Sequence, residues 1–280
     1  RKQFSGNQSG FAKELNFALK TVAKMVNHFK QVYIINETMR AEIDFIRQAL
    51  REDSGISFEV PIAFIIPRTP TASLFGDSSL RACGGYSTAL RVWWYLPFPD
   101  DIVHRTLLHM KNNDNETFIL INCLEYVTII VNYCAAISAI LEDDNIADPH
   151  PVVLCVMDNI SAKNWTVHTS KKSLIGRALA RFFCGLLIGS NVGINATWIS
   201  THANKVADEI SRIKSTHNPT SFQYDFSNLQ QGHVELKHCR FFQPSQELLS
   251  MIWDILLTRR SPDLSKVLQL KQNGFGKLSI

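Results

Sequence analysis

The sequence lacks several features that would assign its class at once. None of its six cysteines forms a CxxC pair, and five lie among apolar or small neighbours, so neither a zinc site nor a disulfide framework is indicated. We therefore expect a reducing, intracellular location, cytoplasmic or nuclear. No signal peptide opens the chain, and because it begins Arg-Lys-Gln without Met we expect a fragment of a longer protein.

Long hydrophobic runs and a uniform charge are also missing. Residues 126–141 are too short to span a bilayer comfortably, and residues 182–204 are interrupted by glycine and asparagine, so no membrane segment is expected. The net charge of +4 excludes a uniformly basic protein but not a local basic patch. The chain has 45% hydrophobic and 19% charged residues, which is the composition of a folded protein with a core.

Three segments with different patterns follow one another along the chain. Residues 1–70 have helical periodicity over 11–51 and then a proline-punctuated connector at 58–70. Residues 71–215 alternate apolar runs of strand and helix length. Residues 216–280 are polar at first and then predict two helices, one at 244–257 and one that begins at Ser261 and ends at Gly274.

The central segment predicts an α/β domain whose mixed sheet is covered by helices. A glycine turn at residues 83–85 is expected to join the first strand to the second. Residues 151–157 form a continuous apolar run, as a strand buried on both faces would. The expected strands are 73–77, 86–94, 118–121, 151–157 and 193–199, and the expected helices are 124–141, 173–187 and 206–213.

Charge is segregated within this domain. Residues 88–159 contain three Lys or Arg and ten Asp or Glu, whereas residues 160–215 contain eight and two. This division suits an enzyme that holds a divalent metal beside a phosphate backbone. Solvated loops of mixed sign are the alternative explanation.

Four carboxylates stand at positions where burial would make them costly. Asp77 and Asp158 end apolar strands, whereas Glu125 and Asp208 lie near the starts of helices. A single acid of this kind is explained by a turn or by a helix dipole. Because sites gather at strand ends in α/β sheets and a buried carboxylate needs a cation beside it, the four together predict a divalent-metal cage.

The motifs around these acids resemble those of type I ribonuclease H. Asp77, followed by Gly84-Gly85-Tyr86, resembles the opening hairpin of that family, and Leu-Glu125 resembles its second catalytic acid. Met-Asp158-Asn-Ile-Ser resembles the third acid as it occurs in retroelements. The segment from Trp-Ile-Ser-Thr-His to Ala-Asp208-Glu-Ile-Ser-Arg resembles the last strand, its loop and the fourth acid. The acids stand in the family order, 48, 33 and 50 residues apart.

Other phrases resemble retrotransposons of the tyrosine-recombinase, or DIRS-like, group. They are Leu-Arg-Val-Trp-Trp and, in the tail, Cys239-Arg-Phe-Phe-Gln-Pro. In that group a reverse transcriptase polymerase region precedes the ribonuclease H domain in the same polyprotein. The implied fold is a ribonuclease H-like mixed five-stranded sheet with helices on both faces, formed by residues 71–215. Residues 1–70 would be a helical connector after the polymerase region, and residues 216–280 a helical tail.

The resemblance implies endonucleolytic hydrolysis of the RNA strand of RNA/DNA hybrids. Two Mg²⁺ ions, which Mn²⁺ could replace, would be held by Asp77, Glu125, Asp158 and Asp208 as catalytic metal ligands. His202 would shuttle a proton or assist product departure, although its loop lacks the family's usual glycine-containing segment. The residues implied to contact nucleic acid are Ser79, Gly84, Gly85, Asn159, Lys163, Trp165, Lys171, Lys172, Arg177 and Arg181.

Simpler explanations and other functions stay open at this point. Arg177 and Arg181 fit a solvated helix face, and Trp165 fits a core position. A catalytically decayed or domesticated copy would bind nucleic acid without cutting it. An integrase or transposase-type strand-transfer domain would use Glu209 as its last acid.

Overall fold

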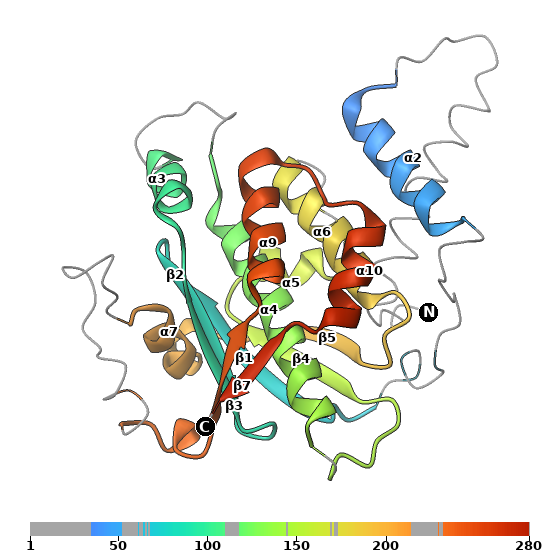
Figure 1. Ribbon diagram of the computed structural model, residues 1–280. Helices are drawn as coiled ribbons and strands as arrows, with labels where there is room; N and C mark the ends of the chain where they lie inside the picture. The colour runs from blue at the N-terminus through green and yellow to red at the C-terminus, as the bar shows by residue number, and fades with distance from the viewer. Residues whose placement is uncertain are drawn as a thin grey trace.

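A computed structural model describes residues 35–51, 61, 64, 66, 68–109, 118–143, 145–168, 170, 173–213, 229 and 232–279 (Figure 1). The strands are β1 (Ala72–Ser78), β2 (Ala82–Ser87), β3 (Val92–Pro97), β4 (Val152–Met157), β5 (Gly193–Trp198), β6 (Arg240–Pro244) and β7 (Gly276–Ser279). The α-helices are α2 (Glu37–Ala49), α3 (Asp100–His109), α4 (Ile121–Leu141), α5 (Ile160–Trp165), α6 (Leu174–Leu187), α7 (Lys205–Ser211), α9 (Gln246–Thr258) and α10 (Leu264–Asn273). Two short 3-10 helices are η3 (Thr201–Ala203) and η4 (Val234–Leu236).

The described strands form one mixed sheet in the order β5-β4-β1-β2-β3-β6-β7. Strand β1 pairs in parallel with β4 and antiparallel with β2, and β4 pairs in parallel with β5. At the other side of the sheet β3 pairs antiparallel with β2 and parallel with β6. Because β1, β4 and β5 run in the same direction, their carboxyl ends meet at one end of the sheet, where α/β proteins place their sites.

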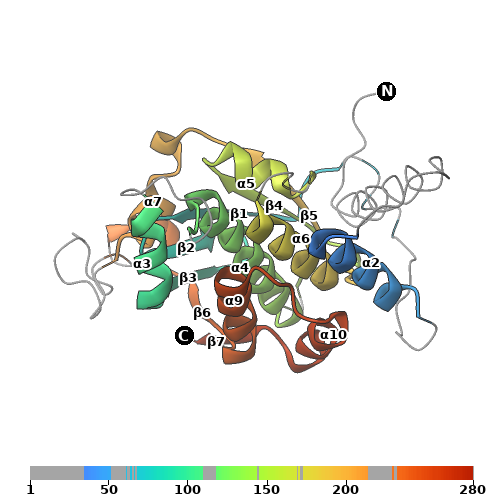
Figure 2. The same cartoon turned by 90° about the horizontal axis from the view of Figure 1, so that it is seen from above.

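Two neighbouring glycines of β2 show how helices cover both faces of the sheet. A Cβ atom at Gly85 would lie 2.5 Å from Asn132 Oδ1 of α4, whereas one at Gly84 would lie 2.3 Å from Ile210 Cγ2 of α7. Successive strand residues point to opposite faces, so α4 and α7 lie on opposite sides of the sheet. Helices α6, α9 and α10 pack on the α4 side, as Figure 2 shows.

Helix α4 is the centre of the hydrophobic core. Its side chains are apolar all round, which is the pattern of a helix buried on every side. By length and hydropathy it also meets the criteria for a membrane span, but 83% of the stretch that does so is buried inside the molecule, and core helices meet the same criteria. Its buried Asn132 accepts a hydrogen bond from Trp94 Nε1 at 2.9 Å.

Several sequence predictions need correction. The sheet has seven strands instead of five, because the tail, predicted to be helical, adds β6 and β7 beside β3. The predicted glycine turn at 83–85 lies inside β2, and the chain turns instead at 79–81 and at 88–91, where Arg91 has a φ of 50°. The predicted strand at 118–121 is absent, since α4 already begins at Ile121.

The flanking segments pack on the central domain through a buried ion pair. Arg181 of α6 pairs with Glu42 of α2, and its Nε donates to Ser261 Oγ at 3.1 Å just before α10. The backbone N–H of Leu264 donates to Gln48 Oε1 at 2.8 Å, so α10 also contacts α2. Residues 11–34 of the helical segment predicted over 11–51, and most of the connector at 58–70, lie outside the described residues.

Candidate metal centre

Three of the four predicted acids come together at the carboxyl ends of β1 and β4. Asp77 lies in β1, Asp158 directly follows β4, and Glu125 is the fifth residue of α4, which packs across β1. One oxygen of each carboxylate lies within 4.8 Å of the others. Asp77 and Glu125 are both only 4% exposed, so this cluster concentrates negative charge in a largely dry place.

Glu125 is as deeply buried as Asp77. Burial raises the pKa of Glu125 well above its usual range, and the charges of Asp77 and Asp158 raise it further, whereas the backbone N–H of Ser78 lowers it by donating to the carboxylate. The other oxygen, Oε2, is buried without a hydrogen-bond partner. A buried carboxylate oxygen of this kind is costly unless a cation or donor meets it, and hard divalent cations prefer oxygen ligands. The donor set therefore fits a divalent cation.

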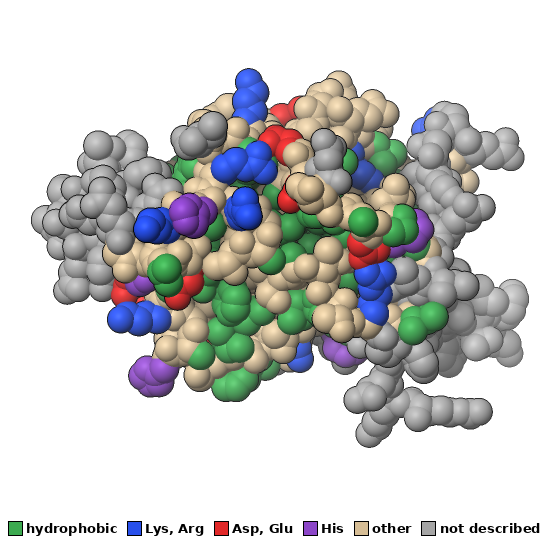
Figure 3. Space-filling model, turned by 90° about the horizontal axis from the view of Figure 1, so that it is seen from below, with side chains coloured by type: hydrophobic (Ala, Val, Ile, Leu, Met, Phe, Trp, Pro, Cys, Tyr) green, Lys and Arg blue, Asp and Glu red, His purple; other side chains and the backbone are tan. Residues whose placement is uncertain are grey.

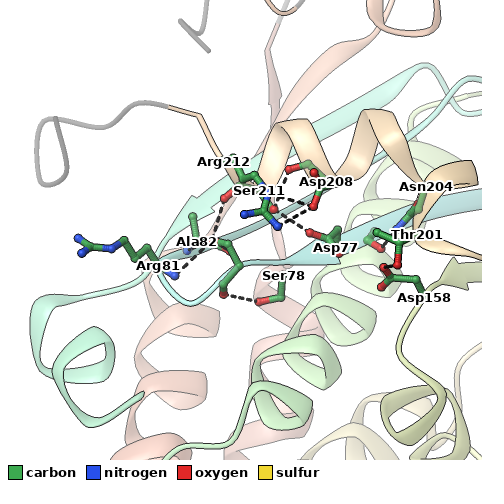
Figure 4. Close-up of polar contacts among 12 residues, drawn as sticks. Asp77, Ser78, Arg81, Ala82, Asp158, Thr201, Asn204, Asp208, Ser211 and Arg212 are labelled. Atoms are coloured by element: carbon green, nitrogen blue, oxygen red, sulfur yellow. Dashed lines mark hydrogen bonds and ion pairs between the residues drawn. The ribbon is translucent and has the colours of Figure 1, made fainter. Parts of the chain in front are cut away.

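Asp77 is held by a residue of α7. Ser211 Oγ lies 2.7 Å from Asp77 Oδ2 and 2.9 Å from the carbonyl oxygen of Asp208, and the side chain of Ser211 is fully buried. Burial raises the pKa of Asp77 to about 6, the hydrogen bond from Ser211 opposes that shift, and the nearby charges of Asp158 and Asp208 add to it. Figure 4 shows Asp77 between the α7 residues and Asp158.

Asp158 is held from the opposite side by the segment after β5. Thr201 Oγ1 donates to Asp158 Oδ2 at 2.7 Å, and Trp198 Nε1 donates to the Asp158 carbonyl at 2.8 Å. The same segment is tied to β1, because Asn204 Nδ2 donates to the Gly76 carbonyl at 2.9 Å (Figure 4). The loop between β5 and α7 thus contacts Asp158 itself and Gly76, the residue before Asp77.

The fourth acid, Asp208, stands beside the cluster but is not one of its members. Among the described residues, the group of ligand atoms within 4.8 Å of one another does not include it. Its Oδ1 accepts hydrogen bonds from Arg212 Nε at 2.9 Å and from Nη2 at 2.8 Å. Its charge still reaches the cluster, since it contributes to the raised pKa values of both Asp77 and Glu125.

The two other candidate catalytic residues on this segment have different surroundings. His202 is exposed in η3, next to Thr201 and therefore close in sequence to the group that holds Asp158. Glu209 is buried, and its carboxylate pairs with His233 and with Lys205. Neither pairing partner belongs to the acid cluster.

Three of the residues predicted to contact nucleic acid have structural roles. Ser79 Oγ accepts hydrogen bonds from the N–H groups of Arg81 and Ala82, so it closes the turn between β1 and β2. Gly84 and Gly85 are buried in the middle of the sheet, where their missing side chains admit α7 and α4. The contact of these three residues with nucleic acid stays a prediction.

The structure places the other residues predicted to contact nucleic acid in different surroundings. Arg181 is buried and paired with Glu42, so it is unavailable to a phosphate, and this prediction is corrected. Lys163 and Arg177 are half-buried, while Trp165 packs edge to face on Tyr126 with ring centroids 5.8 Å apart. Asn159 caps α5 and donates to Asn122 Oδ1 at 3.0 Å. Lys171 and Lys172 lie outside the described residues.

Four residues of the site were given no role from the sequence. Ser211 and Arg212 follow Asp208 by three and four residues in the quoted motif, and Thr201 and Asn204 lie in the segment before it. In the sequence only their positions could have indicated a role, because each has a polar or charged side chain close to a strand end or to an acid. Their contacts across the sheet depend on the loop conformation, which spacing alone does not give.

Comparison of the chain with family models, with curated proteins and with solved structures found no match.

Proposed function

We propose that this chain is the ribonuclease H part of a retroelement reverse transcriptase and cuts the RNA strand of RNA/DNA hybrids. The observation that carries the proposal is the convergence of Asp77, Glu125 and Asp158 within 4.8 Å from three separate elements. Their order along the chain and the motifs around them are those of the resemblance. Asp208, on the adjacent helix, supplies the fourth acid that such a site needs.

The arrangement of strands also supports this proposal. The five strands of residues 71–215 are contiguous in the sheet, in the order β5-β4-β1-β2-β3, and they include both parallel and antiparallel pairs. The two extra strands, β6 and β7, are added outside β3, on the side away from the acids. A five-stranded mixed sheet with helices on both faces is therefore contained within the larger sheet.

The acids would hold divalent cations, and the rest of the site would keep the acids in place. Asp77, Glu125 and Asp158 would bind a first ion, and Asp208 would join them for a second. Bound ions of this kind activate water and stabilise the leaving oxygen of a phosphodiester. Ser211 and Thr201 keep Asp77 and Asp158 oriented through their hydroxyl groups, and Ser78 N–H fixes Glu125.

The choice of substrate would follow from shape and charge. An RNA/DNA hybrid has 2′-hydroxyl groups on one strand only, which lets a protein tell the strands apart. Lys163 on α5 and Arg177 on α6 retain partial exposure and would meet phosphates. Contacts of this kind are independent of base sequence and weaken with salt.

A cleavage assay on a labelled hybrid tests the proposal. We expect the chain to cut the RNA strand in the presence of Mg²⁺ or Mn²⁺ and not with EDTA. Asp77→Asn and Asp158→Asn should abolish cutting while circular dichroism stays unchanged. Asp254→Asn, which neutralises an exposed acid on α9, is the matched control and should cut at the parental rate. Equal cutting by all variants would disprove the assignment.

The same preparation separates the other two functions. A decayed or domesticated module would bind the hybrid without cutting it under either metal. A strand-transfer domain would join DNA ends and would require Glu209. The pairing of Glu209 with His233 does not favour that role.

A further inference from the structure

The basic residue that ends α7 has an unusual position relative to the acids. Arg212 is the C-cap of α7 and places two guanidinium N–H groups on Oδ1 of Asp208. Its charge also acts on Asp77 and Asp158, so the guanidinium faces the cluster as well as its own partner. Figure 4 shows it beside Ser211 and Asp208, above Asp77.

The backbone around Arg212 is held by buried contacts, whereas its side chain is half exposed. Ser211 is fully buried against Asp77, and the Ile213 carbonyl accepts a hydrogen bond from Tyr95 Oη at 3.2 Å. The side chain of Arg212 is 50% exposed and that of Asp208 is 28% exposed. Pairs this open to solvent are weak, so the guanidinium can leave Asp208 at little cost while the helix stays in place.

We infer that Arg212 is an internal competitor for Asp208, and that it sets the affinity of the site for its second divalent cation. This inference rests on the proposed function, because it requires that the acids bind metal. A cation must displace an arginine from Asp208, whereas Oε2 of Glu125 has no hydrogen-bond partner to displace. The first ion would therefore bind more tightly than the second, and Arg212 would increase the difference between the two affinities.

Titration of the whole chain with Mn²⁺, without nucleic acid, tests this inference by calorimetry and by electron paramagnetic resonance. We expect a tighter and a weaker binding event in the parent, and loss of the weaker one in Asp208→Asn. Arg212→Gln should tighten the weaker event by roughly two- to fivefold, the worth of a solvent-exposed pair, and should leave the tighter event nearly unchanged. If the parent shows one event, a second event that appears in Arg212→Gln is the equivalent result.

A matched control removes the trivial effect of net charge. Lys205→Gln neutralises another exposed base on α7, one that pairs with Glu209 instead of Asp208, and should leave both events as in the parent. Equal binding by Arg212→Gln and the parent, or an equal gain in Lys205→Gln, would overturn the role of Arg212 alone. A parent that binds no Mn²⁺ would overturn the proposed function together with this inference.

Discussion

The ionisation of Asp77 is set by two opposing contacts at the scale of single side chains. Burial favours the protonated carboxyl, whereas the hydroxyl of Ser211 stabilises the carboxylate at 2.7 Å. Removing that hydroxyl in Ser211→Ala should raise the pKa of Asp77 further and weaken Mn²⁺ binding about tenfold, as loss of a hydrogen bond to a charged group does. Calorimetric titration measures the change. Ser265→Ala, on the exposed face of α10, should bind like the parent.

The raised pKa of Asp77 also predicts a pH dependence of stability. The folded-state pKa of about 6 lies above the unfolded value of 3.8, so the folded chain holds more protons between these values. This contribution to the free energy of unfolding is fully present below about pH 4 and is lost as the pH rises through 6, by about 3 kcal/mol in all. In urea unfolding with EDTA present, the free energy of unfolding should therefore fall as the pH rises through this window, relative to that of Asp77→Asn. Parallel profiles for the two proteins would contradict the prediction.

Added metal should reverse that loss, because cations bind the ionised carboxylates. The increase in the urea midpoint of unfolding on adding Mn²⁺ is expected to grow as the pH rises through 6. In Asp77→Asn this increase should stay near zero.

The individual acids were predictable from the sequence, whereas their supports were not. Asp77, Glu125 and Asp158 each break an apolar pattern at a strand end or helix start, and that pattern is local. Thr201, Asn204 and Ser211 act on residues more than 40 positions away in the chain. Arg181 was misplaced for a similar reason, since only the packing of α2 on α6 reveals that Glu42 buries it.

At the scale of elements, the contact between β2 and α7 fixes where Asp208 and Ser211 stand. A Cβ atom at Gly84 would lie 2.3 Å from Ile210 Cγ2 and 3.0 Å from the Trp94 carbonyl oxygen. Gly84→Ala should therefore push α7 outward, lower the free energy of unfolding by about 1–3 kcal/mol and weaken metal binding. Thermal unfolding and Mn²⁺ titration measure the two effects.

A second glycine provides the comparison for Gly84. A Cβ atom at Gly232 meets nothing within 4 Å, so Gly232→Ala should leave both stability and metal binding unchanged. If Gly84→Ala bound metal normally and lost affinity only for the hybrid, the predicted role of this glycine in approaching nucleic acid would be supported.

The elements with strong periodicity were predicted within a few residues, and the errors lie where one signal has two meanings. Residues 151–157 and 173–187 correspond to β4 and α6 because continuous apolar runs and caps such as Ser173 act locally. The pair Gly84-Gly85 reads equally as a turn or as a strand that two helices approach closely, and only the tertiary packing decides. Strands β6 and β7 were missed because their partners are distant in the chain.

At the scale of the whole molecule, charge is mixed over the surface. Figure 3 shows Lys and Arg side chains standing among acidic, hydrophobic and other residues on one face. Log affinity falls as log salt rises when bases bind phosphates. If the half-buried bases of α5 and α6 do so, Arg177→Gln should make this fall shallower, by about 0.9 in the slope. Hybrid binding measured by fluorescence anisotropy at several salt concentrations gives this slope.

Arg181, one turn further along α6, supplies the contrast to Arg177. Arg181→Gln would leave Glu42 buried without its partner, so we expect a loss of about 3–5 kcal/mol in the free energy of unfolding and an unchanged salt slope in the folded protein. A slope reduced equally in both variants would show that the buried position of Arg181 is wrong.

The tail is part of the same hydrophobic core as the acid-bearing strands. Phe242 of β6 is fully buried in the cluster that also contains Leu74 of β1 and Leu124 of α4. Since one core unfolds cooperatively, we expect the whole chain to unfold in a single transition. Phe242→Ala should lower the free energy of that unfolding by about 3–5 kcal/mol. Gln243→Ala, the exposed neighbour on the same strand, should change it by less than about 0.5 kcal/mol. Two separate transitions in Phe242→Ala, with the metal-binding part unaffected, would mean that the tail folds independently of the site.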